Sequence, residues 1–389
     1  MHPVENRIEP TLLRRINERR LLEVIQQQGP SSRASLTRAS GMTAPTVSKA
    51  VESLLKRGLV EEMEPIDQIL GRPGRLLCMA ARSAAVIGVV IESDRCCLVS
   101  SGLDGRFLES QTRRCVTPSS YDALLDVIEF HCRDLIGVLQ GTVQGIGISV
   151  PGLVNERLRE ITVSPNLHLL DKRNPARDLE KRLSIQCLLF QETEALCLSE
   201  QLYGEARGRP DFAMLDVSTG LGLGVMSGGR LLTGHSGLAG ELGHITIDPN
   251  GMECGCGNRG CLETLATDAA LARLISEKIG RSIGIDEALE IIQSGRVDVD
   301  DEIKKVSQYL SIAIAAVINI FNPTTLFVYG GLLSSSPETL QNVVTQVEQR
   351  ALAPSMADCR IVVARGSKRQ GAIAGMIHHL THAWAPSIR

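Results

Sequence analysis

The sequence predicts an α/β protein with a winged helix-turn-helix in its N-terminal part. Two observations lead to this prediction, and a third indicates a metal site. Apolar residues recur at helical spacing between residues 12 and 55, and short strand-like runs follow them. From residue 85 onward, apolar strands alternate with amphipathic helices, which is the order of elements in an α/β fold. Three cysteines and a histidine gather between residues 241 and 263, among glycines that leave little side chain for an apolar core.

Composition and charge bound the class of protein. A chain of 389 residues with 43% hydrophobic residues can bury the cores of two or three domains, so it needs no disulfides. Its longest apolar run is too short for a membrane span, and its N-terminus lacks a secretory signal, so the sequence predicts a cytoplasmic protein. Residues 1–80 hold 12 Lys+Arg against 9 Asp+Glu, although the whole chain has a net charge of -3. A basic segment before an acidic body indicates a nucleic-acid-binding module on a globular sensor or enzyme.

Three helices are predicted in the basic segment. The first is amphipathic and spans about residues 12–28. The second begins near Ser32 and ends before Gly41, which can supply a left-handed turn. The third begins at Thr43 and tolerates Pro45 in its first turn. Two short helices joined through a glycine indicate a helix-turn-helix, with an ordinary three-helix bundle as the alternative.

Two predicted strands, residues 59–61 and 75–79, favour the helix-turn-helix because they would form a wing. Between them, a Gly-Arg-Pro-Gly segment holds the backbone extended, so that its arginines could enter a narrow A·T-rich minor groove. A solvated basic hairpin tip is the alternative. On the third helix, the face opposite the apolar stripe would contact base edges and phosphates. The predicted DNA-contacting residues are Thr43, Pro45, Thr46, Lys49, Arg72 and Arg75.

The predicted α/β part of the chain begins near residue 85. A glycine-rich segment at residues 218–224 lies between two predicted strands, where it suits a phosphate or a tight hairpin. The predicted strands are residues 86–91, 97–100, 145–150, 213–217, 326–329 and 360–363, and the predicted helices are residues 121–138, 267–279, 285–293, 301–321 and 371–379.

The spacing His244-x9-Cys254-x-Cys256-x4-Cys261 offers four ligands that suit a tetrahedral metal ion. With no position left for water, the site would be structural rather than catalytic. Two disulfides or four unrelated residues are the alternatives, but a Cys-Gly-Cys pair cannot easily close on itself. We therefore predict one structural zinc ion per chain, held by these four residues.

The same stretch resembles the signature of the ROK family, which contains repressors, sugar kinases and open reading frames. The pattern E-x-G-H is followed by C-x-C-G-x-x-G-C-x-E. The resemblance implies that Glu241, His244 and Glu263 bind sugar hydroxyls, in keeping with a metal-fixed imidazole and acceptor carboxylates. For Glu263 the alternative is a solvated charge at a helix start. Residues 13–79 resemble the winged helix-turn-helix of ROK repressors of the NagC/XylR/Mlc type.

Two further elements resemble this family. Residues 164–167 resemble its P-N-L element, in which Asn166 would help to hold the sugar, or would be only a turn residue. The Asn-Asp pair of the kinases falls on Gln191 and Glu192, which we expect to be sugar ligands, with a structural helix-start acid as the alternative for Glu192.

The resemblance implies a two-lobed, actin-like (ribonuclease-H-like) ATPase fold behind the winged helix-turn-helix. We expect the DNA-binding domain at residues 1–80 and the first lobe at residues 81–189, completed by a C-terminal helix at about 376–389. The second lobe, at residues 190–375, would carry the zinc site and the contacts of a homodimer or homotetramer.

The kinase phosphate loop of the family, D-x-G-G-T, is altered in this chain. Val90 stands where the aspartate would be, and Glu92 and Ser93 replace the glycine pair. A valine cannot help to hold magnesium, and Glu92 would repel a triphosphate. Because phosphoryl transfer depends on such positioning, we expect no enzyme and no catalytic residue.

The sequence therefore predicts a transcriptional regulator that represses genes of sugar uptake or catabolism. A sugar or sugar phosphate would release it from a double-stranded operator. An ATP-dependent ROK sugar kinase, or a repressor controlled by a sugar-transport protein, is the alternative.

Overall fold

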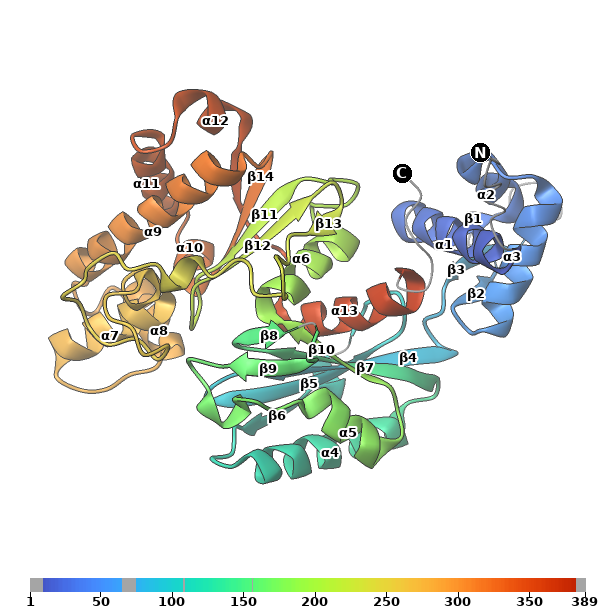
Figure 1. The fold of residues 1–389 in the computed structure, drawn as a ribbon, viewed down its shortest axis with the longest axis horizontal. Helices are drawn as coiled ribbons and strands as arrows, with labels where there is room; N and C mark the ends of the chain where they lie inside the picture. Colours follow the sequence, from blue (N-terminus) through green and yellow to red (C-terminus); the bar gives the residue numbers. More distant parts are fainter. Residues whose placement is uncertain (1–9, 65–74, 108, 156, 383–389) are drawn as a thin grey trace, which may run out of the picture. The chain divides into compact units, whose positions relative to one another are not determined.

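The computed structural model describes residues 10–64, 75–107, 109–155 and 157–382 (Figure 1). The chain forms two compact units. Unit 1 comprises residues 1–149, 175–188 and 369–389, and unit 2 comprises residues 150–174 and 189–368. The division into three domains at residues 80 and 189 stays a prediction.

Unit 1 begins with the predicted helix-turn-helix. Its three helices are α1 (Pro10–Gln28), α2 (Arg33–Ser40) and α3 (Ala44–Lys56). The hydroxyl of Ser32 accepts the amide hydrogen of Ser35 and caps α2, and Gly41 ends α2 in the left-handed conformation with φ 66°. Apolar side chains of the three helices form a common core, which includes Leu21, Leu22, Leu36, Val47, Val51 and Leu54.

A small antiparallel sheet completes the winged helix-turn-helix. It consists of β1 (Ser31–Ser32), β3 (Leu76–Met79) and β2 (Val60–Met63), in the order β1-β3-β2. β2 and β3 pair antiparallel, so the chain returns as predicted for a wing. The loop that joins them, with Arg72, lies outside the described residues.

The main sheet of unit 1 has five strands in the order β10-β7-β4-β5-β6. Helices α4 (Tyr121–Val138) and α5 (Pro175–Leu183) cover one face, and α13 (Lys368–His382) covers the other (Figure 1). A Cβ atom on Gly147 would lie 2.1 Å from the carbonyl oxygen of Ala372, so only glycine allows α13 this close. The strands are β4 (Ala84–Ile91), β5 (Arg95–Ser101), β6 (Arg113–Val116), β7 (Thr142–Val150) and β10 (Cys187–Gln191).

Unit 2 contains a second five-stranded sheet, in the order β13-β12-β11-β14-β15. Numbered within each sheet, both orders read 3-2-1-4-5, with the first three strands antiparallel and the fourth parallel to the first. This repeated topology confirms the predicted two-lobed actin-like fold. The strands are β11 (Phe212–Asp216), β12 (Gly222–Ser227), β13 (Arg230–Leu231), β14 (Thr325–Tyr329) and β15 (Arg360–Val363).

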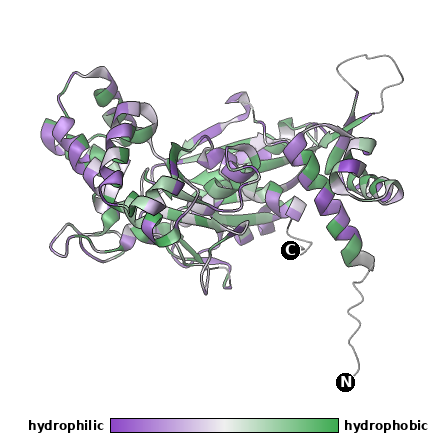
Figure 2. Ribbon diagram, turned by 90° about the horizontal axis from the view of Figure 1, so that it is seen from above, coloured by the Kyte–Doolittle hydropathy of each residue, from purple (hydrophilic) through white to green (hydrophobic). Residues whose placement is uncertain are grey.

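Alternation along β11 divides the core of unit 2 between the two faces of its sheet. Phe212 and Met214 pack with α6 (Glu192–Tyr203), whereas Ala213 and Leu215 pack with α7 (Asp268–Ile279) and α9 (Asp300–Phe321). Helices in Figure 2 carry both hydrophobic and hydrophilic residues, as expected for helices that cover a sheet. The remaining elements are α8 (Ile285–Ser294), α10 (Gly331–Ser335), α11 (Pro337–Glu348), α12 (Ala353–Asp358), β8 (Leu153–Asn155) and β9 (Glu160–Val163).

Helix α9 is, among the described helices, the one long and apolar enough to cross a membrane by length and composition. Half of its most apolar window is buried inside the protein. Its buried residues, such as Ile314 and Val317, belong to the core of unit 2. These contacts identify α9 as a core helix.

Within unit 1, two histidines of α13 pack toward α1, the first helix of the winged helix-turn-helix. The rings of His378 and His382 are stacked, with centroids 4.5 Å apart. Nε2 of His382 lies 3.6 Å from Oε1 of Glu23, which also pairs with Arg19 at 2.8 Å. Burial, together with the positive charge of Arg19, lowers the pKa of His378 to about 3 and that of His382 to about 4.

This pair predicts a pH dependence of stability. Both pKa values lie below the ordinary value of 6.5, so the unfolded chain binds two protons that the folded chain does not bind. We therefore expect the free energy of unfolding to keep its full value above about pH 6.5 and to fall progressively as the pH is lowered toward 4. Thermal unfolding of the wild type and of a His378→Gln, His382→Gln variant across this range measures the effect. Equal pH slopes for the two proteins would contradict it.

Candidate functional site

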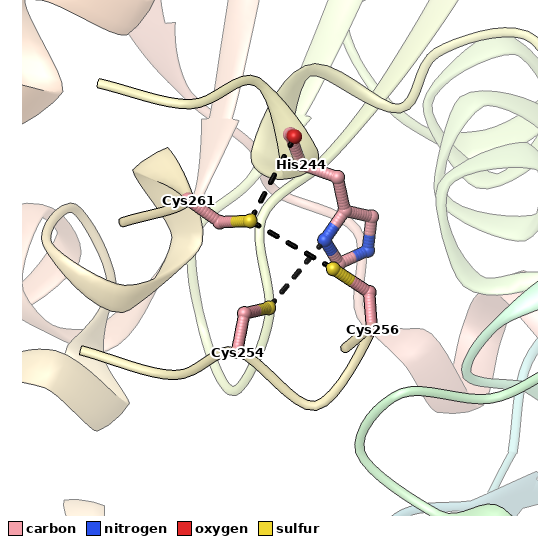
Figure 3. Close-up of side chains that lie close together, drawn as sticks. All are labelled: His244, Cys254, Cys256 and Cys261. Carbon is pink, nitrogen blue, oxygen red and sulfur yellow. Dashed lines mark hydrogen bonds between the residues drawn. The ribbon is translucent and has the colours of Figure 1, made fainter. Parts of the chain in front are cut away.

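The four predicted metal ligands converge at one point in unit 2 (Figure 3). Their ligand atoms all lie within 4.8 Å of one another. The Sγ atoms of Cys256 and Cys261 are 3.7 Å apart, and Sγ of Cys254 is 3.7 Å from Nδ1 of His244. These distances exclude disulfide bonds between the thiols. They match the edges of a tetrahedron with metal–ligand bonds of about 2.0–2.3 Å, whose edges measure roughly 3.6–3.8 Å.

The loop that carries the thiols is folded by its own backbone. Thr246 and Cys261 form an isolated antiparallel bridge, and the amide of Cys254 donates to the carbonyl oxygen of Asn258 at 2.8 Å. A Cβ atom on Gly260, which has φ +63°, would lie 1.5 Å from the carbonyl oxygen of Asp248. The turn therefore requires glycine at this position. The backbone thus sets the cysteines in place without an apolar core of their own.

The chemistry of the donor set fits a metal ion. Cys254 and Cys261 are buried, and burial raises the pKa of both thiols. A bound cation favours the thiolate form, so metal binding would release protons from these side chains. The cluster can therefore bind a metal, and three sulfurs with one imidazole nitrogen are a typical ligand set for structural zinc.

A cavity lies beside the metal cluster, with all its walls in unit 2. Its empty space measures about 460 Å³, which includes space open to solvent. The six residues predicted to bind a sugar all line it. They are Asn166, Gln191, Glu192, Glu241, His244 and Glu263.

Glu263 connects the cavity to the metal cluster. It lies in a short 3-10 helix (Leu262–Thr264) and is only 9% exposed, so the alternative of a solvated charge is wrong. One carboxylate oxygen accepts the amide hydrogen of Leu221 at 3.0 Å, and the other lies 3.7 Å from Sγ of Cys254. Folding of the thiol loop therefore fixes this carboxylate in the cavity wall.

Glu241 and His244 are linked in the same wall. Glu241 precedes a short 3-10 helix (Leu242–His244) and His244 ends it, and Nε2 of the imidazole is 3.7 Å from a carboxylate oxygen of Glu241. The side-chain amide of Gln191 donates to the other oxygen at 3.2 Å. Burial raises the pKa of Glu241, and the hydrogen bond from Gln191 opposes that shift.

Glu192 begins helix α6 and pairs with a buried lysine. Nζ of Lys368 lies 2.7 Å from Oε1 of Glu192 and 3.3 Å from Oδ2 of Asp216. Lys368 is 4% exposed and Asp216 is 3% exposed, so this ion-pair network is shielded from water. Glu192 is thus both a helix-start acid, as one interpretation predicted, and a wall of the cavity.

Asn166 and Glu263 both lie next to Gly220 in the glycine-rich turn. A Cβ atom on Gly220 would lie 3.0 Å from Nδ2 of Asn166 and 2.7 Å from Oε2 of Glu263. Glycine at this position therefore leaves both side chains room. Asn166 is exposed, while its loop is held by Ser164, whose hydroxyl donates to the carbonyl oxygen of Pro151 at 3.1 Å.

The glycine-rich segment after β11 forms a tight hairpin, one of its two predicted roles. Asp216 pairs with Gly222 across the hairpin, and a Cβ atom on Gly224 would lie 2.6 Å from Sγ of Cys197 on α6. Close packing of α6 therefore explains this glycine.

In unit 1, a segment stands in place of the kinase phosphate loop. Its backbone groups are hydrogen-bonded within the protein. Val90 is 1% exposed within β4. The amide of Glu92 donates to the carbonyl oxygen of Arg95 at 2.9 Å, and the hydroxyl of Thr117 donates to the carbonyl oxygen of Glu92 at 2.7 Å. The turn is an ordinary β4–β5 connection.

Four of the predicted DNA-contacting residues lie together at the start of α3. Thr43, Pro45 and Lys49 are exposed, and the hydroxyl oxygens of Thr43 and Thr46 are 2.9 Å apart. Arg75 lies at the base of the wing, where it pairs with Glu62 at 2.7 Å. Arg72 lies outside the described residues.

Sequence reasoning missed Asp216 and Lys368. Asp216 ends a strand just before a glycine-rich turn, a position that often carries ligand-binding residues and could have been found. Lys368 lies 176 residues from Glu192 along the chain and has no local motif, so only the fold brings the two together.

Comparisons with known proteins agree with this architecture. A model described as "ROK family" matches residues 86–382, and one described as "Winged helix-turn-helix DNA-binding" matches residues 14–61. The chain is 28% identical over 345 residues to a xylose repressor of Bacillus spizizenii, covering 88% of this chain and 89% of the relative. It is 25% identical over 357 residues to the DNA-binding transcriptional dual regulator NagC of Escherichia coli K12, covering 88% and 86%.

A solved structure gives the same result. A ROK family transcriptional regulator, described as a homolog of the E. coli MLC protein, superimposes with a TM-score of 0.79 at 25% identity, covering 95% of this chain and 97% of that one. The family model alone spans well over half of the chain. The chain therefore belongs to the ROK family, with a winged helix-turn-helix before its ROK body.

Proposed function

We propose that this chain is a cytoplasmic transcriptional repressor of sugar uptake or catabolism genes, released from its operator by a sugar or a sugar phosphate. The observation that carries the proposal is the cavity in which the six residues predicted to bind a sugar meet. These residues come from four separate segments of unit 2 and offer mainly hydrogen-bond acceptors, which suit the hydroxyls of a sugar. The DNA-binding half of the proposal is supported by the winged helix-turn-helix match and by the repressors that the chain resembles.

The same contacts argue against a sugar kinase. A catalytic base must be free to accept the proton of the attacking hydroxyl, but Glu192 is paired with the buried ammonium of Lys368. The altered phosphate loop, with Val90 and Glu92, supplies no ligand for magnesium at the expected position. The chain is accordingly a regulator rather than an enzyme.

The proposal includes zinc and an oligomer. Zinc bound by His244 and the three cysteines would brace Glu263 and the imidazole in the cavity wall. A single winged helix contacts too little DNA for useful affinity, so a homodimer or homotetramer would bind two half-sites about one or two helical turns apart. A sugar-transport protein could serve as the releasing partner in place of a free sugar.

Selection of bound genomic fragments with the purified full chain tests this function. We expect enriched fragments to share a two-fold symmetric site next to genes of carbohydrate uptake or catabolism. Lys49→Ala should weaken binding to all fragments and reduce the salt dependence, because Lys49 is expected to contact phosphate. Lys304→Ala, an exposed lysine of α9, is the matched control. A protein that enriches no fragment but phosphorylates sugars with ATP would be the kinase instead.

A further inference from the structure

Acidic side chains predominate among the charged residues that line the cavity. Four of its lining residues are acidic, and no lysine or arginine is among the described residues that line it. Behind the wall, Lys368 is shared between two of the acids. The imidazole of His244 is directed with Nδ1 toward Cys254 and Nε2 toward Glu241. The acidic residues are Glu192, Asp216, Glu241 and Glu263.

Such a wall selects its ligand by hydrogen-bond type. Ionised carboxylates only accept hydrogen bonds, so a ligand that fits must donate them. The hydroxyls of a sugar are donors, whereas a phosphate group presents acceptor oxygens and nearly two negative charges at neutral pH. Like charges brought together in a confined site disfavour binding strongly.

Two backbone amides of the glycine-rich turn already donate to carboxylates of the protein. Amide groups of glycine-rich turns commonly bind phosphates. In the turn after β11, the amide of Leu221 donates to Glu263 at 3.0 Å. The amide and hydroxyl of Ser218 both donate to Oδ1 of Asp216, at 3.0 and 2.6 Å. These two amides are therefore not available to an anionic ligand.

We propose that the effector bound in this cavity is an uncharged sugar, and that the acidic wall excludes sugar phosphates. This inference rests on the proposed sugar-binding function and narrows its ligand class. The signal for the repressor would then be the free sugar and not the phosphate ester that is made from it.

Calorimetric titration of the full chain with matched pairs of ligands tests the inference. Suitable pairs are glucose, mannose and N-acetylglucosamine, each against its 6-phosphate, and xylose against its 5-phosphate. We expect at least one parent sugar to bind and its phosphate ester to bind at least about 100-fold more weakly. An ester that binds as tightly as its parent, or more tightly, would overturn the inference while leaving the sugar site intact. Failure of every ligand to bind would contradict the proposed function, and the inference would fall with it.

Two variants test the physical cause. Glu192→Gln and Asp216→Asn each remove one carboxylate and leave Lys368 less neutralised. In either folded variant, the affinity of the ester relative to its parent should rise at least about tenfold. Glu338→Gln, an exposed acid at the start of α11, is the control and should leave the ratio unchanged. An unchanged ratio in both test variants would show that charge is not the basis of selection.

Discussion

Glu241→Ala is expected to give a repressor that no longer responds to its sugar. Glu241 lies in the cavity wall, where it accepts a hydrogen bond from Gln191. It is not one of the four metal ligands, so folding, metal content and DNA binding should persist. Loss of hydrogen bonds from sugar hydroxyls to a charged acceptor costs about 1.5–3 kcal/mol, so release should require about 10- to 100-fold more sugar.

DNA release measured by fluorescence anisotropy against sugar concentration checks this result. Glu241→Gln keeps an acceptor oxygen and should retain part of the response. Glu338→Ala changes an exposed acid far along the chain from the cavity residues and should respond like the wild type. If Glu241→Ala released DNA at the wild-type sugar concentration, the effector site would lie elsewhere, or a partner protein would control the repressor.

Cys254→Ala is expected to remove both the metal and much of the stability of unit 2. Cys254 is 4% exposed, and its Sγ atom contacts both His244 and Glu263. The loop around it has little apolar packing of its own, so metal binding and folding of the loop should be coupled. We expect about one zinc per chain in the wild type, none in the variant, and a Tm lowered by roughly 6–12 °C.

Elemental analysis and thermal unfolding measure these two effects. Cys359→Ala is the matched control, since Cys359 is also a buried cysteine of unit 2 but lies outside the metal cluster. It should keep the metal and lose only the packing of one thiol. Active wild-type protein that contains no metal would show that the cluster has another role. Because Glu263 is fixed beside Cys254, a metal-free protein should also fail to respond to sugar.

Local patterns in the sequence were sufficient for the elements and for the metal cluster. Helix α4 spans Tyr121–Val138 as its apolar periodicity predicts, and α2 ends at Gly41 because that residue adopts the left-handed turn. The four metal ligands lie within 18 residues of one another, so spacing alone brings them close. The resemblance to the ROK family predicted the cavity residues, because a family pattern links residues that lie far apart in the sequence.

Other elements gave no clear local signal. Helices α5, α11 and α12 were not predicted; α5 itself is strongly charged, and α11 and α12 have a proline in their first turn. Their positions are set by packing on the sheets and on α9, and tertiary contacts of this kind outweigh weak intrinsic propensities.

The sequence by itself determined the winged helix-turn-helix, the alternation of strands and helices, and the metal ligands, because each depends on residues close together in the chain. Only the tertiary structure decided how the charges of the cavity are paired. It placed Lys368 between Glu192 and Asp216, and it directed the amides of the glycine-rich turn to the carboxylates of the protein. The reason is physical: a buried ion pair depends on distance in space, and residues far apart in sequence become neighbours only when the sheet and its helices have packed.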